Sequence, residues 1–117
     1  MATQQDCIFC KIVAGEIPAA KIFEDERAVA FRDVNPQAPM HALVIPRAHI
    51  ASLADAGEAD EALLGHLLLV AARVARDEGH AEGGFRTVVN TGAGAGQTVF
   101  HVHIHVLGGR KLAWPPG

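Results

Sequence analysis

The sequence has no cluster of basic residues and no long apolar run. Its ten Lys and Arg residues are spread over 117 residues, and the formal net charge is −3 at pH 7. A nucleic-acid-binding surface needs a basic stripe facing the phosphates, so the composition argues against such a partner. The longest apolar run, at 67–72, is far shorter than the roughly 20 residues that cross a bilayer. We therefore expect neither nucleic-acid nor membrane binding.

Cysteine is also scarce. Cys7 and Cys10 stand in a C-x-x-C spacing, and neither has a distant partner for a disulfide. The first residues, MATQQDC, show neither the basic start nor the apolar region of a secretion signal. Together these features predict a reduced, cytoplasmic protein. No repeat, low-complexity tract or linker interrupts the sequence, so we expect one domain over 1–117.

The hydrophobic pattern predicts five strands and two helices. Helices are expected over 8–15 and 58–78, the second because its apolar residues recur at helical spacing. The strands are expected over 21–25, 27–34, 41–45, 85–90 and 98–107. Short loops join most of them, which indicates an antiparallel sheet with helices on one face, an α+β domain.

Three histidines alternate with apolar residues in HVHIHVL, residues 101–107. In a strand, His101, His103 and His105 share one face. They could bind one metal, hold one of their number as a catalytic base or nucleophile, or form a solvated face. A solvated face is the usual fate of one or two histidines but is the least expected for three. A shared metal is difficult because the outer two lie far apart along a straight strand.

A glycine-rich loop, TGAGAGQT at 91–98, leads directly into these histidines. Glycine lets backbone N–H groups approach a phosphate closely, although such a loop by itself is more often a flexible hairpin. It is neither a P-loop nor a dinucleotide fingerprint, because no Lys-Ser/Thr pair and no helix follow it. It does place Gln97 and Thr98 beside the imidazoles, and the combination predicts an anion site with a nucleophile.

Two more polar residues lie on predicted strands. Asp33 follows an apolar strand face, where a carboxylate costs free energy unless it is satisfied. It either caps the turn at 35–36 or accepts the hydroxyls of a ribose, with Phe31 and Val34 as walls for a flat base. His41 is either an edge histidine or a partner that orients a catalytic imidazole.

The C-x-x-C pair has the spacing of a structural zinc site, which needs two further ligands. His49 and His101 are the candidates. A pair of small buried thiols in a helix is an equally good interpretation. A thioredoxin-like redox motif is a poorer one, because no βαβ pattern surrounds it.

These motifs resemble the histidine-triad (HIT) family, whose His-x-His-x-His signature, followed by two apolar positions, is matched by HVHIHVL. The resemblance is closest to the Hint branch of nucleotide-binding phosphoramidases. It rests on four segments: EIPAAKIFEDE, FRDVNPQAPMHALVIPRAHI, VVNTGAGAGQTVFHVHIHVLGGR and the terminal WPPG. It implies a single HIT domain over 1–117, with a five-stranded antiparallel sheet and two helices per subunit. It also implies a homodimer with a continuous ten-stranded sheet.

The resemblance further implies hydrolysis of the P–N bond of purine nucleoside 5′-phosphoramidates and of related acyl-nucleotides, with AMP- or GMP-type substrates and no cofactor required for catalysis. His103 would attack the α-phosphorus and form a covalent nucleotidyl-histidine. His105 and the backbone around Thr98 would hold phosphate oxygens, and His41 would hydrogen-bond toward His103. His101 would be left free as a zinc ligand.

The remaining site residues follow from the same resemblance. The phosphate site would also be lined by Asn90, Gly96, Gln97 and Val99. The ribose hydroxyls would be held by Asp33. The base pocket would be formed by Ile8, Phe9, Ile17, Phe31 and Val34. A structural zinc would be held by Cys7, Cys10, His49 and His101.

Two features depart from the Hint branch. Thr98 stands where serine is common, and the C-x-x-C pair is absent from many Hint proteins and resembles the zinc-carrying members of the wider family. Three other functions remain open: dinucleoside polyphosphate hydrolysis or nucleotidyl transfer, a nucleotide-binding regulatory role with incidental catalysis, and a metalloenzyme with zinc on the triplet. Trp114 in the terminal WPPG favours the phosphoramidase branch, and this segment would reach the partner subunit's site.

Overall fold

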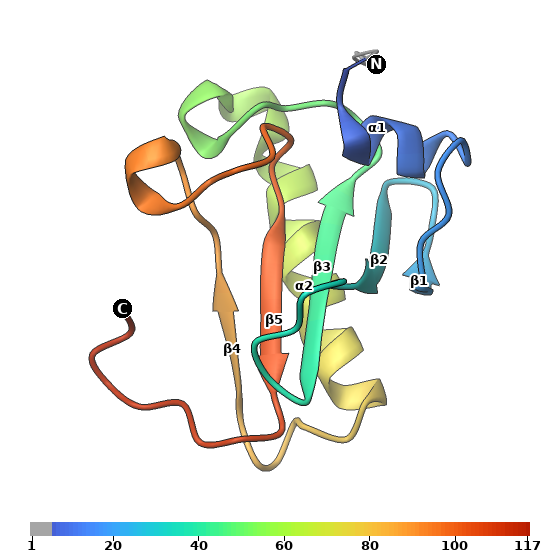
Figure 1. Cartoon of the computed structure of the whole chain (residues 1–117). Coiled ribbons are helices and arrows are strands. Elements are labelled where there is room, and N and C mark those ends of the chain that lie inside the picture. The colour runs from blue at the N-terminus through green and yellow to red at the C-terminus, as the bar shows by residue number, and fades with distance from the viewer. Residues whose placement is uncertain (1–5) are drawn as a thin grey trace.

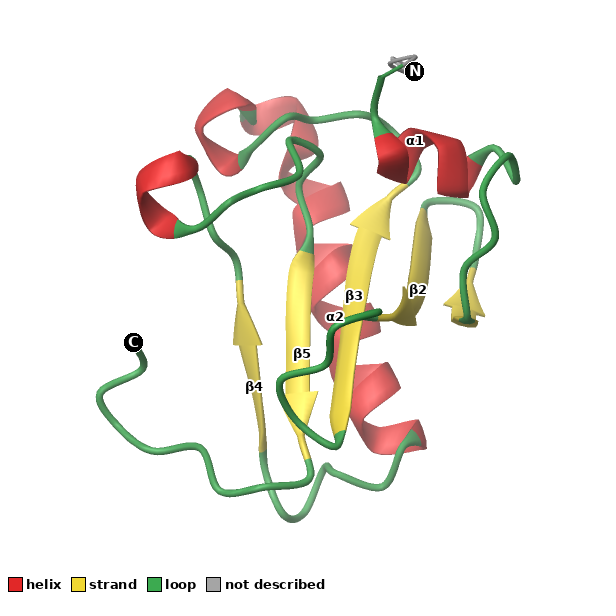
Figure 2. Cartoon of the chain, viewed as in Figure 1, coloured by secondary structure: helices red, strands yellow, loops and turns green. Residues whose placement is uncertain are grey.

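The computed structural model describes residues 6–117 as one antiparallel sheet with a long helix behind it and a short helix across one end (Figure 1, Figure 2). The helices are α1 (Ile8–Val13) and α2 (Glu61–Asp77). The strands are β1 (Lys21–Glu24), β2 (Ala28–Arg32), β3 (Met40–Pro46), β4 (Phe85–Val88) and β5 (Ile104–Gly108). The spatial order is β1-β2-β3-β5-β4, with every pair antiparallel. The predicted α+β fold, with five strands and two helices, is confirmed.

The central strand β3 is buried on both faces, and its alternation divides the core in two. Ala42 and Val44 point toward α2, whose Leu67, Val70 and Val74 pack against them. On the other face, residues of β2 and β3 pack against α1; this cluster contains Phe9, Ile12, Val29, Phe31, Leu43 and Ile45. The short α1 spans only one end of this second face (Figure 1). No helix among residues 6–117 is long and apolar enough to span a membrane.

The last strand is shorter than the sequence predicts. A strand is expected over 98–107, but β5 begins only at Ile104. The β3–β5 register pairs Val44 with Ile104, so Val102 would lie opposite Pro46. Proline has no N–H to donate to a ladder, and the N–H of Val102 donates instead to the carbonyl of Ile50, at 2.6 Å. The predicted strand boundary is therefore wrong, and only the last residue of the histidine triplet lies on β5.

Two leucines of α2 test this packing, because Leu67 is fully buried whereas Leu69 is 71% exposed. Leu67→Ala should lower the free energy of unfolding by about 2–5 kcal/mol, through lost apolar burial and the cavity left behind. Leu69→Ala, the matched control on the same helix, should change it by only about 0.5 kcal/mol. Urea unfolding of both variants measures the difference. Equal losses would contradict this orientation of α2.

Candidate active site

His103 lies just before β5 and is held in one tautomer by the main chain. Its Nδ1–H donates to the carbonyl oxygen of His101 at 2.7 Å. A carbonyl oxygen can only accept, so in the neutral ring Nδ1 carries the proton and Nε2 keeps its lone pair. The ring of Phe9 packs edge-on against the imidazole, with centroids 5.2 Å apart. His103 therefore has an unprotonated nitrogen in a fixed orientation, as a nucleophile requires.

His101 is fully buried and is held in the opposite sense. Its Nε2–H donates to the carbonyl of Pro46 at 2.8 Å, which leaves Nδ1 as the unprotonated nitrogen. Burial is the main cause that lowers the pKa of His101 to about 4, so the ring is neutral at pH 7. Nδ1 faces the sulfur atoms of Cys7, at 3.2 Å, and Cys10, at 3.5 Å.

The structure brings the four predicted metal ligands together. The Nδ1 atoms of His49 and His101 are 3.2 Å apart, and Cys10 Sγ lies 3.3 Å from Nδ1 of His49. Tetrahedral zinc with bonds of about 2.0–2.3 Å places its ligand atoms roughly 3.3–3.8 Å apart. Cys7 is the N-cap of α1 and Cys10 lies in its first turn, so both thiols face the histidines from the same end of the helix. Two thiols and two imidazole nitrogens at these distances fit a structural zinc.

His41 contacts a different member of the triplet from the one expected. The resemblance to the histidine-triad family predicts a hydrogen bond from His41 toward His103, but Nε2 of His41 lies 2.9 Å from Nδ1 of His105. In the β3–β5 register His41 faces Leu107, so His105 is its diagonal neighbour on the same face of the sheet. His103 precedes the strand and lies further along. Nor is His41 an edge histidine, since β3 is central and the side chain is buried.

Both members of the His41–His105 pair are neutral at pH 7. Burial is the main cause that lowers the pKa of His105 to about 4, and the neighbouring His103 and His41 lower it further. Burial also lowers the pKa of His41, against the opposing effect of the Asp33 carboxylate. The imidazoles of His103 and His105 are adjacent, with ring centroids 5.1 Å apart.

Asp33 adopts the turn-capping role and also faces His41. Its Oδ1 accepts the N–H of Asn35 at 2.8 Å, which forms an Asx-turn. Its Oδ2 lies 3.4 Å from Nε2 of His41. Asp33, His41 and His105 are thus close enough to hold a metal. However, Nδ1 of His41 accepts the N–H of Gln37 at 3.0 Å, so the ring proton is on Nε2, and a metal there would displace it.

The glycine-rich loop is braced by its own glutamine. The side chain of Gln97 is buried: its Oε1 accepts the N–H of Gly92 at 2.8 Å, and its Nε2 donates to the carbonyls of Ala51 and Val99. This side chain therefore stabilises the loop through internal hydrogen bonds, whereas the resemblance to the histidine-triad family predicts that it lines the phosphate site. Gly96 has φ +94, a left-handed conformation that favours glycine, and a Cβ there would lie 3.9 Å from Nδ2 of Asn90.

The predicted base-binding residues are split between core and surface. Phe9 and Phe31 are buried and stack edge-to-face, with centroids 5.5 Å apart, and Ile17 packs against the same cluster. Val34 is fully exposed, and Ile8 is about half exposed. A pocket of about 560 Å³ opens beside α1 and the loop. It is lined by Asp6, Cys7, Ile8, His49, Ala51, Thr98, Val99 and Phe100.

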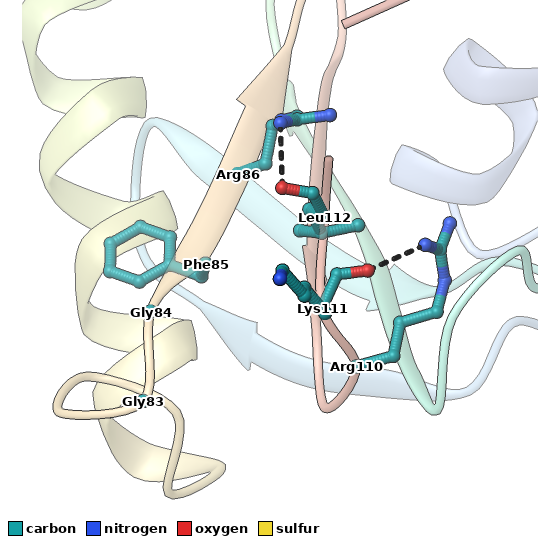
Figure 3. Close-up of a pocket in the computed structure, with 7 residues that line it drawn as sticks. All are labelled: Gly83, Gly84, Phe85, Arg86, Arg110, Lys111 and Leu112. Atoms are coloured by element: carbon teal, nitrogen blue, oxygen red, sulfur yellow. Dashed lines mark hydrogen bonds between the residues drawn. The ribbon is translucent and has the colours of Figure 1, made fainter. Parts of the chain in front are cut away.

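A second pocket, of about 290 Å³, lies away from the histidines (Figure 3). Its basic residues are Arg86, Arg110 and Lys111. Arg86 Nη2 donates to the carbonyls of Leu112 and Ala113, at 3.2 and 2.8 Å, and Arg110 Nη1 donates to the carbonyl of Lys111. Arg86 of β4 therefore holds the C-terminal segment against this strand.

Sequence reasoning missed the main-chain groups that orient the imidazoles. These are the carbonyls of Pro46 and His101 and the N–H of Gln37. Main-chain groups are the same at every position, so no residue type marks them. The proline that ends β3 is the nearest signal, because it interrupts the ladder where the chain must turn His101 inward.

Known proteins share both the sequence and this fold. A family model for the HIT domain matches residues 14–112. An uncharacterized HIT-like protein of Synechococcus elongatus is 58% identical over 113 residues, covering 97% of this chain and 98% of the relative. A HIT family hydrolase from Legionella pneumophila is 51% identical, with a TM-score of 0.94, and the match covers 96% of this chain and 100% of that one. A histidine triad protein from Clostridium difficile is 44% identical, with a TM-score of 0.93 and coverage of 96% and 97%. The chain belongs to the HIT domain family.

Proposed function

We propose that this protein hydrolyses the P–N bond of purine nucleoside 5′-phosphoramidates through a covalent nucleotidyl intermediate on His103. The observation that carries the proposal is the fixed tautomer of His103, whose Nε2 is unprotonated while Nδ1–H is bound to a main-chain carbonyl. The similarity to a HIT family hydrolase of Legionella pneumophila supports a hydrolase.

The reaction proceeds in two displacements. Nε2 of His103 attacks the α-phosphorus, the P–N bond breaks, and the amine takes up a proton from solvent as it leaves, while the Nε2–H of neighbouring His105 donates a hydrogen bond to the leaving nitrogen. The nucleotidyl-imidazole formed is a cation that retains its Nδ1–H, and the carbonyl of His101 stabilises this charge. Water then attacks the phosphorus, the P–Nε2 bond breaks, His103 returns to its neutral Nδ1–H form, and the proton lost by the attacking water passes to solvent. Splitting the displacement in this way is ordinary covalent catalysis.

The nucleotide would lie across the loop and the open end of the sheet. Thr98, exposed beside the pocket, and the neighbouring backbone of Gly96 and Val99 would face the phosphate oxygens. Asp33 would hold the ribose hydroxyls through the oxygen that faces His41. Of the residues predicted to bind the base, Ile8 and Val34 are the ones with exposed side chains.

Two further features belong to the proposal. A structural zinc on Cys7, Cys10, His49 and His101 would cross-link α1 to the chain before β5. It would stabilise the fold and would not take part in the reaction. A homodimer with a continuous sheet would use an exposed edge strand, and β4 is one of the two edges. The C-terminal segment with the exposed Trp114 would then reach the partner's site.

His103→Ala should abolish turnover of an adenosine 5′-phosphoramidate while AMP still binds, because only the nucleophile is lost. Intact-protein mass spectrometry during turnover, without an acid quench, should show an adduct of one AMP on the wild type alone. His66→Ala is the control, since His66 contacts Asp25 and Arg27 away from the site. Near wild-type turnover by His103→Ala would remove this assignment.

The zinc proposal predicts about one zinc per chain in protein purified without chelator, measured by elemental analysis. Cys10→Ser should lose the metal and lower the thermal unfolding midpoint, since a structural metal contributes directly to folding. Glu82→Gln, an exposed carboxylate outside the cluster, is the control. Metal-free protein whose midpoint does not respond to added zinc would contradict the site.

The lowered pKa of His105 predicts that the protein loses stability in acid. The unfolded chain takes up this proton near pH 6.5 but the folded chain only near its pKa of about 4, so stability falls as the pH drops through this window. Denaturant titrations from pH 7 to 4.5 should show a loss about 1–3 kcal/mol smaller for His105→Gln than for wild type. His101 has a similarly low pKa in both proteins and cancels in the comparison. Identical pH dependence would contradict the buried neutral state of His105.

A further inference from the structure

The loop between β2 and β3 points one main-chain N–H into the active site. The N–H of Gln37 donates to Nδ1 of His41 at 3.0 Å. Gln37 stands between Pro36 and Pro39, in a loop that begins after Arg32 and ends at Met40.

Four other hydrogen bonds hold this amide in place. Asp33 Oδ1 accepts the N–H of Asn35 at 2.8 Å, and the side-chain Nε2 of Gln37 donates to the carbonyl of Asn35 at 3.0 Å. From the C-terminal segment, Nε of Arg110 donates to the carbonyl of Gln37 at 3.1 Å. The loop is closed at its base by the N–H of Asp33, which donates to the carbonyl of His41. The direction of the Gln37 N–H is therefore set by contacts from several sides.

A neutral imidazole carries one ring proton, so a donor at one nitrogen determines the other. Because Nδ1 of His41 accepts from Gln37, its proton is on Nε2, which lies 2.9 Å from Nδ1 of His105. Two protons cannot face each other at this distance, so Nδ1 of His105 accepts and its proton is on Nε2. Asp33 Oδ2, 3.4 Å from Nε2 of His41, favours the same arrangement.

We infer that the main-chain amide of Gln37 is a positioning group, which fixes the tautomers of His41 and His105 and makes His105 a hydrogen-bond donor beside the nucleophile. The adjacent ring of His103 is fixed in the opposite sense by the carbonyl of His101. One imidazole thus presents a lone pair and its neighbour presents an N–H. The low pKa of both His41 and His105 keeps the pair neutral, the state in which a tautomer is defined.

The same geometry excludes a relay of protons through His41. If His41 passed its Nε2 proton to His105, the ring would become an imidazolate, because Nδ1 faces an N–H and receives no proton from it. His41 therefore acts by holding His105 and does not carry protons to it.

Nuclear magnetic resonance of ¹⁵N-labelled histidine tests the inference without any substrate. Two-bond ring correlations distinguish Nδ1–H from Nε2–H tautomers, and the signals are assigned with His41→Gln and His105→Gln. At pH 7.5 both His41 and His105 should be Nε2–H tautomers, while His103 should be Nδ1–H. In uniformly ¹⁵N-labelled protein, a scalar coupling should connect the Gln37 amide nitrogen with Nδ1 of His41 across the hydrogen bond. An Nδ1–H tautomer at His41, or no coupling to the Gln37 amide, would overturn the inference.

A proline substitution removes the main-chain proton donor, and an alanine substitution at the same position controls for the lost side chain. Gln37→Pro lacks the N–H, whereas Gln37→Ala keeps it and loses the side-chain bond to Asn35. The His41 spectrum should change to a mixed or Nδ1–H tautomer in Gln37→Pro and stay as in wild type in Gln37→Ala. Equal spectra for the two variants would overturn the inference.

A kinetic test rests on the proposed function. Read together with the spectra, it distinguishes failure of the proposed function from failure of the inference. A hydrogen bond from His105 to the leaving atom matters for an alkylamine, which leaves poorly, but little for p-nitrophenolate, which leaves readily without one. Gln37→Pro should slow kcat for the phosphoramidate by about 10²-fold, with a much smaller effect on the nucleoside 5′-p-nitrophenyl phosphate, and Gln37→Ala should slow neither selectively. The tautomer change with an equal effect on both substrates would support the inference and contradict the proposed role of His105.

Discussion

The hydrogen bond from His103 to the carbonyl of its neighbour His101, 2.7 Å long, is the contact on which the rest of the site depends. It joins two groups of side chains: the ring of His101 faces two thiols and a second imidazole, while its main-chain oxygen orients the imidazole of His103. Packing reinforces the link, because Phe9 of α1 lies against both imidazoles. A cross-link between α1 and His101 would therefore also stabilise the position of His103.

The fold follows from the sequence pattern to a large extent. Period-two alternation in β3 and helical spacing in α2 each place apolar residues on known faces, and the two clusters of the core follow from them. The start of the last strand was harder to predict, because HVHIHVL alternates without interruption through 101–107. The ladder ends where it does because of Pro46 on the facing strand. Such a constraint is visible only once the register is known.

The candidate site shows the same division. Residue types and spacing were enough to predict the triplet, His41, Asp33 and the C-x-x-C pair as candidate site residues. The structure places each of them in contact with a partner. Their orientation was not predictable, since it is set by peptide groups that any residue supplies. Gln97 illustrates the limit: its type suggested a phosphate contact, yet its amide is buried within its own loop.

Pro46 determines which main-chain groups next to the sheet can form hydrogen bonds with side chains. Had β5 continued to pair with β3 through Val102, the carbonyls of this segment would have pointed sideways into the ladder. Instead, the carbonyl oxygen of His101 accepts a hydrogen bond from the ring of His103, and the carbonyl oxygen of Pro46 accepts one from the ring of His101. One imino acid thus converts half of a would-be strand into an irregular segment whose peptide groups are available to side chains. Because Pro46 lacks an amide hydrogen, the sheet ends just before the segment that carries His101 and His103.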